Sequence, residues 1–144
     1  CLLPNVSGYT ENIEVHSIVG RFLEHARVYC FGVAPYQRIY ISSADMMTRN
    51  TEKRVEVACP IYDEQLKKRI LHDLSIMWHD NVKARCLQCD GSYLPLPQVG
   101  ETINSQEVLM QEAKERAREA LLNQVVTKPS FKARVQHWLH HKQK

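Results

Sequence analysis

The chain has 144 residues with a formal net charge of +3, 44% hydrophobic residues and 24% charged residues, values that are ordinary for one soluble globular domain. No apolar run approaches the ~20 residues that a membrane-spanning helix requires, and we expect no signal peptide because the charged and apolar regions of one are absent. The five cysteines are scattered and odd in number, which favours reduced thiols and a cytoplasmic location over a disulfide-stapled secreted fold.

The first third of the chain predicts a helix followed by a β-hairpin. In residues 13–24, apolar side chains recur at one-turn spacing, which predicts a short helix. Residues 26–33 and 38–43 are rich in β-branched and aromatic side chains, and the turn-like sequence APYQ separates them, so they predict a hairpin. The polar residues 44–52 are expected to form a loop.

A strand, a helix and a second strand are predicted next. Residues 54–59 (RVEVAC) alternate between polar and apolar side chains, as a strand does. Asp63 is placed to cap a helix whose apolar side chains share one face: Leu66, Ile70, Leu74, Met77 and Trp78. Residues 81–88 (NVKARCLQ) predict another strand, and the sequence DGSY after them predicts a turn.

The C-terminal part has a different character. Residues 104–124 favour a long helix, and residues 127–144 carry five Lys or Arg residues, three His and no acidic residue. Such a basic tail can bind nucleic acid, an anionic membrane or polyphosphate, although a solvated terminal helix is the ordinary interpretation. We therefore expect a mixed α/β (α+β) domain around one sheet over residues 1–100, followed by a helical, basic tail over 101–144.

One group of residues suggests a phosphate site. His25 and Arg27 are two apart in a predicted strand, so their side chains point the same way. Histidine titrates near neutrality, and arginine offers a planar fork of donors that suits phosphate oxygens. The neighbouring strand ends in Ser42 and Ser43, which lead into a loop whose hydroxyls and free backbone N–H groups could cradle an anion.

The spacing of these residues resembles the signature of the phospholipase D superfamily, His-x-Lys followed on the next strand by Gly-Ser-x-Asn. Here Arg27 replaces the lysine, Ser42-Ser43-Ala44-Asp45 replaces the second motif, and Gly32 stands where an aspartate is expected. On this pattern alone, a structural role for His25 stays open.

Three longer blocks, in this order, resemble the C-terminal part of bacterial polyphosphate kinase: ENIEVHSIVGRFLEHARVYCFG, IYISSADMMTRNTEKRVEVACPI and DNVKARCLQCDGSY. The resemblance covers about residues 1–113. It implies that the chain is a fragment of a C-terminal domain with the phospholipase D-like fold.

The resemblance also implies an activity. Polyphosphate kinases reversibly transfer the terminal phosphate of ATP to inorganic polyphosphate through a phosphohistidine, with Mg²⁺. The phosphorylated histidine belongs to the preceding domain, so this fragment alone is expected to be inactive, and the Mg²⁺ ligands are expected outside it. The implied partners are ATP, ADP, polyphosphate and the preceding domains of the same protein. Specific nucleic-acid binding is not expected, while the oligomeric state and peripheral association with a membrane stay open.

The candidate site residues are assigned on this basis. His25 matches the second histidine of the family pattern, which lies at the nucleotide and phosphoryl site, so it is the expected catalytic residue, acting as an acid or a hydrogen-bond donor. Arg27, Ser42 and Ser43 are expected to bind the phosphates of ATP. The alternative is that Arg27 pairs with Glu24 or Asp45 and that the serines only cap the loop.

Two other interpretations compete with this one. Cys86 and Cys89 form a single CxxC motif that His72 and His79 could complete as a zinc site, but a strong zinc signal would need a second pair, and the family does not use cysteines there. We therefore predict no metal ligands in this chain. The functional alternatives are a phospholipase D-like phosphodiesterase or nuclease and a non-catalytic anion-binding module.

Overall fold

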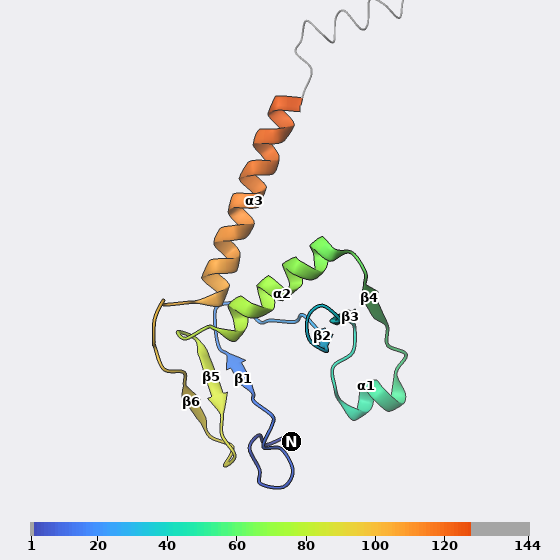
Figure 1. Ribbon diagram of the computed structural model, residues 1–144, viewed down its shortest axis with the longest axis vertical. Helices are drawn as coiled ribbons and strands as arrows, with labels where there is room; N and C mark the ends of the chain where they lie inside the picture. Colours follow the sequence, from blue (N-terminus) through green and yellow to red (C-terminus); the bar gives the residue numbers. More distant parts are fainter. Residues whose placement is uncertain (1, 128–144) are drawn as a thin grey trace, which may run out of the picture. The chain divides into compact units, whose positions relative to one another are not determined.

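Strands and helices alternate along residues 2–127, the part of the chain that the computed structural model describes (Figure 1). In chain order the elements are β1 (His16–Ile18), β2 (Val28–Phe31), β3 (Arg38–Ser42), α1 (Thr48–Lys53), β4 (Ala58–Ile61), α2 (Glu64–Trp78), β5 (Ala84–Leu87), β6 (Tyr93–Pro95) and α3 (Ser105–Thr127). The mixed α/β fold class is confirmed. The contacts divide the chain into two units, residues 1–106 and 107–144. Of the predicted tail (101–144), residues 128–144 lie outside the described residues.

The first sheet contains the predicted hairpin. Strands β2, β3 and β4 are antiparallel, and Tyr29 faces Tyr40 across the first pair of strands. The strand predicted at 54–59 forms later, at 58–61, and includes Pro60. Proline cannot donate a hydrogen bond to a neighbouring strand, so it is tolerated because β4 lies at the edge of this sheet.

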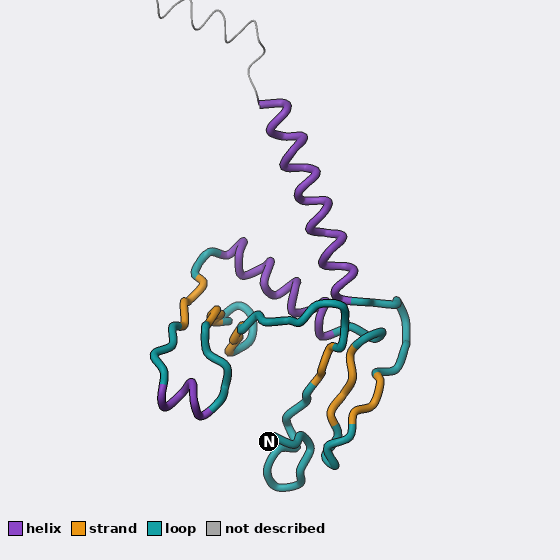
Figure 2. The backbone as a smooth tube through the Cα atoms, turned by 180° about the vertical axis from the view of Figure 1, so that it is seen from behind, coloured by secondary structure: helices purple, strands orange, loops and turns teal. Residues whose placement is uncertain are grey.

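The second sheet replaces a predicted helix. Strands β1, β5 and β6 are antiparallel in that order, so the described residues form two separate sheets and the expectation of one sheet is wrong (Figure 2). The helix predicted at 13–24 is also wrong, because His16–Ile18 pairs with β5 and the residues after it are irregular. Pairing with a strand far along the chain overrides the local periodicity.

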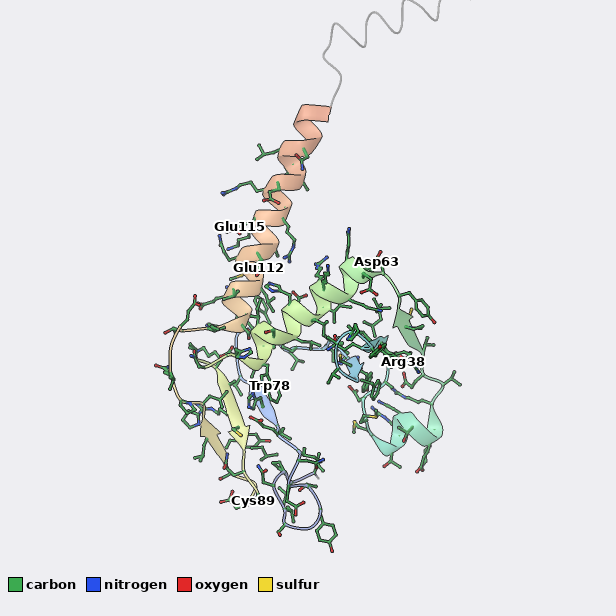
Figure 3. The ribbon with its side chains drawn as sticks, in the orientation of Figure 1. Arg38, Asp63, Trp78, Cys89, Glu112 and Glu115 are labelled. Carbon is green, nitrogen blue, oxygen red and sulfur yellow. The ribbon has the colours of Figure 1, made fainter. Side chains whose placement is uncertain are left out.

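Helix α2 begins where the sequence predicts. The Asp63 carboxylate accepts a hydrogen bond from the Leu66 backbone N–H at 2.8 Å, and Asp63 is labelled at this end of the helix in Figure 3. By its place in the chain, α2 joins the last strand of the first sheet to the central strand of the second. The loop predicted over 44–52 is only partly correct, because α1 begins at Thr48.

A buried carboxylate organises the residues around β5. Asp80 is fully buried, and its Oδ1 accepts hydrogen bonds from the backbone N–H groups of Val82, Lys83 and Ala84 at 2.7–3.2 Å. Its Oδ2 accepts two more, at 2.7–2.8 Å, from the backbone and hydroxyl of Ser105. Asp80 therefore joins the start of β5 to the first residue of α3.

Gln106, the residue after Ser105, forms hydrogen bonds with the segment that leads to β2. Its side chain is buried, donates from Nε2 to the Phe22 carbonyl at 2.8 Å and accepts from the Phe22 N–H at 3.0 Å. The same Nε2 donates to the Glu24 carboxylate. Gly20 lies against this amide, and a Cβ at Gly20 would overlap it.

The apolar core of the described residues is small. Among the described residues, the buried apolar side chains are Pro4, Ile39, Ala84 and Leu87, while Leu23 and Val55 are 94% and 99% exposed. None of the helices between residues 2 and 127 combines the length and the apolar character needed to cross a membrane.

Candidate functional site

His25 and Arg27 lie side by side just before β2. The Arg27 carbonyl accepts a hydrogen bond from the Ser42 N–H at 2.9 Å, so the pairing of this segment with β3 extends back to Arg27. His25 is exposed, and its Nε2 accepts a hydrogen bond of 2.8 Å from the Arg27 Nη2. Because a guanidinium can only donate, the neutral imidazole in this arrangement carries its hydrogen on Nδ1.

Arg27 is held by Asp45, which follows β3. The Nε and Nη2 atoms of Arg27 bind the two carboxylate oxygens at 2.6 and 3.0 Å. The hydrogen bond from Arg27 holds the pKa of Asp45 below its usual value, and the charges of Arg27, His25 and Arg49 add to this effect. In return, the Asp45 carboxylate raises the pKa of Arg27. This bidentate pair fixes the plane of the guanidinium beside His25.

The two serines make internal hydrogen bonds. The Ser42 hydroxyl donates to the Val57 carbonyl at 3.0 Å and accepts from the Ala44 N–H at 3.1 Å. The Ser43 hydroxyl donates to the Glu56 carboxylate and accepts from the Val57 N–H. The backbone N–H groups of Ser42, Ser43 and Ala44 are also paired, so the expectation of free N–H groups is wrong at these three positions.

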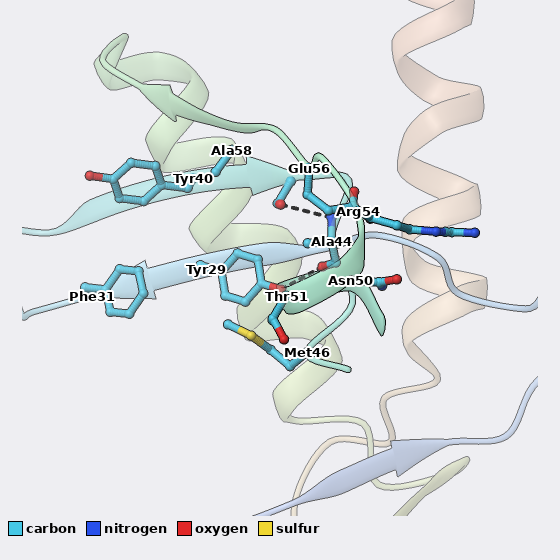
Figure 4. A pocket seen from close by; sticks show the side chains of 11 residues that line it. Tyr29, Phe31, Tyr40, Ala44, Met46, Asn50, Thr51, Arg54, Glu56 and Ala58 are labelled. Atoms are coloured by element: carbon cyan, nitrogen blue, oxygen red, sulfur yellow. Dashed lines mark hydrogen bonds between the residues drawn. The ribbon is translucent and has the colours of Figure 1, made fainter. Parts of the chain in front are cut away.

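A hollow of about 560 Å³ lies over one face of the first sheet (Figure 4). Tyr29, Phe31 and Tyr40 supply its aromatic wall, and the Phe31 and Tyr40 rings meet edge to face with centroids 6.1 Å apart. The Tyr29 hydroxyl donates to the Ala44 carbonyl at 2.8 Å. The other residues that line the hollow are Ser42, Ala44, Met46, Asn50, Thr51, Arg54, Glu56 and Ala58.

The structure brings some of the predicted site residues to this hollow and leaves others beside it. Ser42 lines the hollow, whereas His25, Arg27 and Ser43 do not. The aromatic wall was missed by the sequence analysis. Tyr29 and Phe31 are two apart in one strand, so their shared face could have been found from the strand period.

The CxxC motif is not assembled as a metal site. Cys86 is half-buried on β5, whereas Cys89 is exposed in the turn before β6 (Figure 3). The His79 ring is within 2.8 Å of the Ser75 carbonyl. Among residues 2–127, no group of potential metal ligands contains both cysteines.

Comparison with known proteins gives a consistent result. The family described as polyphosphate kinase C-terminal domain 2 matches residues 1–106. A polyphosphate kinase of Staphylococcus epidermidis is 45% identical over 113 residues, which are 78% of this chain and 15% of that protein. One from Bacillus cereus is 50% identical over 93 residues, which are 65% of this chain and 13% of that protein.

A solved structure agrees with the sequence relatives. The crystal structure of polyphosphate kinase from Porphyromonas gingivalis has a TM-score of 0.75 and 31% sequence identity, and the match covers 83% of this chain and 18% of that one. The chain therefore spans about one sixth of the length of the curated relatives that it matches. From these matches and the mixed α/β fold, the chain belongs to the polyphosphate kinase C-terminal domain 2 family.

Proposed function

We propose that the intact protein carrying this chain is a polyphosphate kinase, which reversibly transfers the terminal phosphate of ATP to inorganic polyphosphate. The observation that carries the proposal is the match of residues 1–106, which include His25, Arg27, Ser42 and Ser43, to the polyphosphate kinase C-terminal domain 2 family. The 45% identity with a polyphosphate kinase over 113 residues supports it. The phosphohistidine of the reaction would lie in a part of the protein outside this chain. The proposed compartment is the cytoplasm.

In this proposal His25 is the catalytic residue of the chain. Its exposed ring can present a hydrogen to a phosphate oxygen from Nδ1, while Arg27 fixes the ring through Nε2. Phosphoryl transfer depends mainly on alignment and charge neutralisation, so a positioned donor beside a guanidinium suits it.

Arg27 and the serines would bind the phosphates of ATP. Two of the Arg27 nitrogens bind Asp45, Nη2 also binds the His25 ring, and Nη1 donates to the His25 carbonyl at 3.4 Å, so the second N–H of Nη1 is the one left for a phosphate oxygen. Ser42 and Ser43 would have to exchange their present hydrogen bonds to Val57 and Glu56 for bonds to phosphate. The proposed order of importance is therefore His25, then Arg27, then the serines.

Magnesium would be held elsewhere in the protein. Mg²⁺ prefers carboxylate and phosphate oxygens, and the carboxylates of Glu24, Asp45 and Glu56 are hydrogen-bonded to Gln106, Arg27 and Ser43. These residues therefore do not fit a metal centre at His25. When bound, Mg²⁺ supplies charge neutralisation on the phosphates.

The test uses the intact protein with ATP and Mg²⁺. We expect ADP and acid-insoluble polyphosphate to appear in step, and ATP to form when polyphosphate and ADP are supplied instead. Release of orthophosphate without polyphosphate, or cleavage of a phosphodiester, would contradict the proposal and favour a hydrolase or nuclease. Binding of anions with no turnover would favour a non-catalytic module.

A further inference from the structure

A second group of side chains lies in the other sheet, away from the His25 site. Glu14, His16 and Cys86 each offer one atom suitable as a metal ligand, and these three atoms lie within 4.8 Å of one another. The His16 Nε2 and the Glu14 carboxylate are hydrogen-bonded at 2.7 Å. This group belongs to the β1–β5–β6 sheet, whereas the residues proposed for phosphoryl transfer lie on or beside the β2–β3–β4 sheet.

The pairing of β1 with β5 brings these residues together. His16 lies directly opposite Cys86 in the register of the two strands. The Leu87 N–H donates to the Val15 carbonyl, so the adjacent pair His16 and Cys86 is the non-hydrogen-bonded kind, in which opposite side chains come closest. Glu14 is two residues before His16, and the alternation of an extended chain places both on one face.

His16 is half-buried, and only one of its two ring nitrogens has a hydrogen-bond partner among the described residues. Its side chain is 9% exposed, and its ring stacks on the Trp78 ring of α2, with centroids 4.2 Å apart and planes 18° apart. The Nδ1 atom is buried and has no hydrogen-bond partner among the described residues. A buried ring nitrogen without a partner is costly, and a metal ion bound at Nδ1 would remove that cost, because the lone pair of the neutral ring would then be coordinated.

The ligand types indicate which metal would bind. A thiolate, an imidazole and a carboxylate together are typical of Zn²⁺, whereas Mg²⁺ prefers oxygen ligands alone. Ligand atoms of one tetrahedral zinc ion lie about 3.3–3.8 Å apart. The three ligand atoms now lie within 4.8 Å of one another, and the Glu14 carboxylate is hydrogen-bonded to His16 Nε2 at 2.7 Å, so Glu14 would give up this bond to reach the ion.

We propose that Glu14, His16 and Cys86 bind one Zn²⁺ ion, which joins β1 to β5. The Cys86 thiol loses its proton to solvent when the metal binds, and the fourth position is open to water or to another part of the protein. This site uses Cys86 of the CxxC motif, whereas Cys89 takes no part in it.

The first experiment titrates the metal-free intact protein with Co²⁺, which reports a thiolate ligand by charge-transfer absorption. We expect this absorption to saturate and to be displaced by Zn²⁺. It should disappear in Cys86→Ser, and the affinity should fall at least about tenfold in His16→Gln. The matched controls, Cys89→Ser and His79→Gln, should behave like the unchanged protein. Absorption that survives Cys86→Ser, or that is lost equally in Cys89→Ser, would overturn the proposal.

The second experiment needs no variant, so a misfolded mutant cannot confuse it. The intact protein is treated with a thiol alkylating reagent with and without Zn²⁺, and the labelled peptides are quantified by mass spectrometry. We expect Zn²⁺ to slow the labelling of Cys86 while Cys30, Cys59 and Cys89, which are exposed, label as before. Equal labelling of Cys86 with and without Zn²⁺ would show that no such site exists.

Discussion

At the scale of single residues, the candidate site depends on how the N–H groups of Arg27 are shared between Asp45 and His25. One guanidinium binds the Asp45 carboxylate through two nitrogens and the His25 ring through one of them. The alternative considered from the sequence, an Arg27–Asp45 pair, is therefore present. It is compatible with a role in phosphate binding, because an arginine fixed in plane still presents one unused N–H, on Nη1.

The first prediction concerns His25. In the intact protein, His25→Ala should lower polyphosphate synthesis by roughly a hundredfold or more, the usual scale for a lost acid or base catalyst. Stability should change by less than about 1 kcal/mol, because the ring is exposed. Initial rates and urea unfolding measure the two effects. An intermediate rate in His25→Gln would favour hydrogen bonding over proton transfer, and unchanged rates in both variants would exclude His25.

The second prediction concerns the pKa of Asp45. Arg27→Gln removes the hydrogen bonds that hold this pKa down, so the pKa of Asp45 should rise toward the ordinary value of about 3.9. A carboxyl whose folded pKa is lowered stabilises the fold above its unfolded pKa, and this contribution is lost as the pH falls through the lowered value.

Carboxyl carbon NMR during a pH titration would measure this shift. Asp90 is the matched control, since its pKa is lowered by the Ser92 side chain and N–H rather than by an arginine, and it should titrate alike in both proteins. An unchanged Asp45 titration in the variant would show that the ion pair does not form in solution.

At the scale of elements, the sequence predicts those whose signals are local. The Asp63 cap and the apolar face after it define α2, and the APYQ turn defines the β2–β3 hairpin. The segment around His16 was predicted incorrectly, because its strand exists only through pairing with β5, which local periodicity does not encode. Likewise, the strand period could have placed Tyr29 and Phe31 on one face, but adding Tyr40 to this aromatic wall requires the cross-strand register, in which Tyr29 faces Tyr40.

The third prediction concerns Asp80, which joins β5 to α3. The Asp80 Oδ2 atom now accepts two hydrogen bonds from Ser105. In Asp80→Asn, an NH₂ group at this position would face the Ser105 N–H and hydroxyl, which are also donors. We expect a loss of about 2–4 kcal/mol in the free energy of unfolding. Asp90→Asn, in an exposed turn, is the control and should cost less than about 1 kcal/mol. Equal losses in urea unfolding would contradict the assigned role.

Asp80 should also contribute to the pH dependence of stability. Burial opposes its ionisation, but the hydrogen bonds from Lys83, Ser105 and Val82 outweigh burial and keep the pKa of Asp80 below its usual value. Its contribution is therefore present above the unfolded pKa of about 3.9 and is lost as the pH falls through the lower folded value. In Asp80→Asn, this part of the acid destabilisation should be missing.

At the scale of the whole molecule, the described residues bury few apolar side chains and expose many. Leu23 and Val55 are almost fully exposed, and the chain spans only 15–16% of several polyphosphate kinases that it resembles. We expect the rest of the protein to cover such residues and to supply the missing parts of the active site.

The fourth prediction follows from this incompleteness. The 144-residue chain on its own should make no polyphosphate, because the proposed phosphohistidine lies outside it and catalytic groups that act together cannot be removed singly without losing most of the rate. ADP formation from ATP and Mg²⁺ measures this, with the intact protein as the control. Sustained ADP formation by the isolated chain would mean that its own residues suffice for the chemistry.

The Gln106 side chain connects the end of the matched family region to the residues just before His25, the candidate catalytic residue. This side chain binds Phe22, 84 positions earlier in the chain, and Glu24, the residue immediately before His25. A genetic screen for loss of enzyme activity should therefore recover changes at Gln106, and bulkier residues at Gly20, beside changes at His25 itself. Gly20, His25 and Gln106 are far apart in the sequence or share no motif, yet changes at them would have the same effect. The reason is that the Gln106 amide lies against Gly20 and binds the segment just before His25.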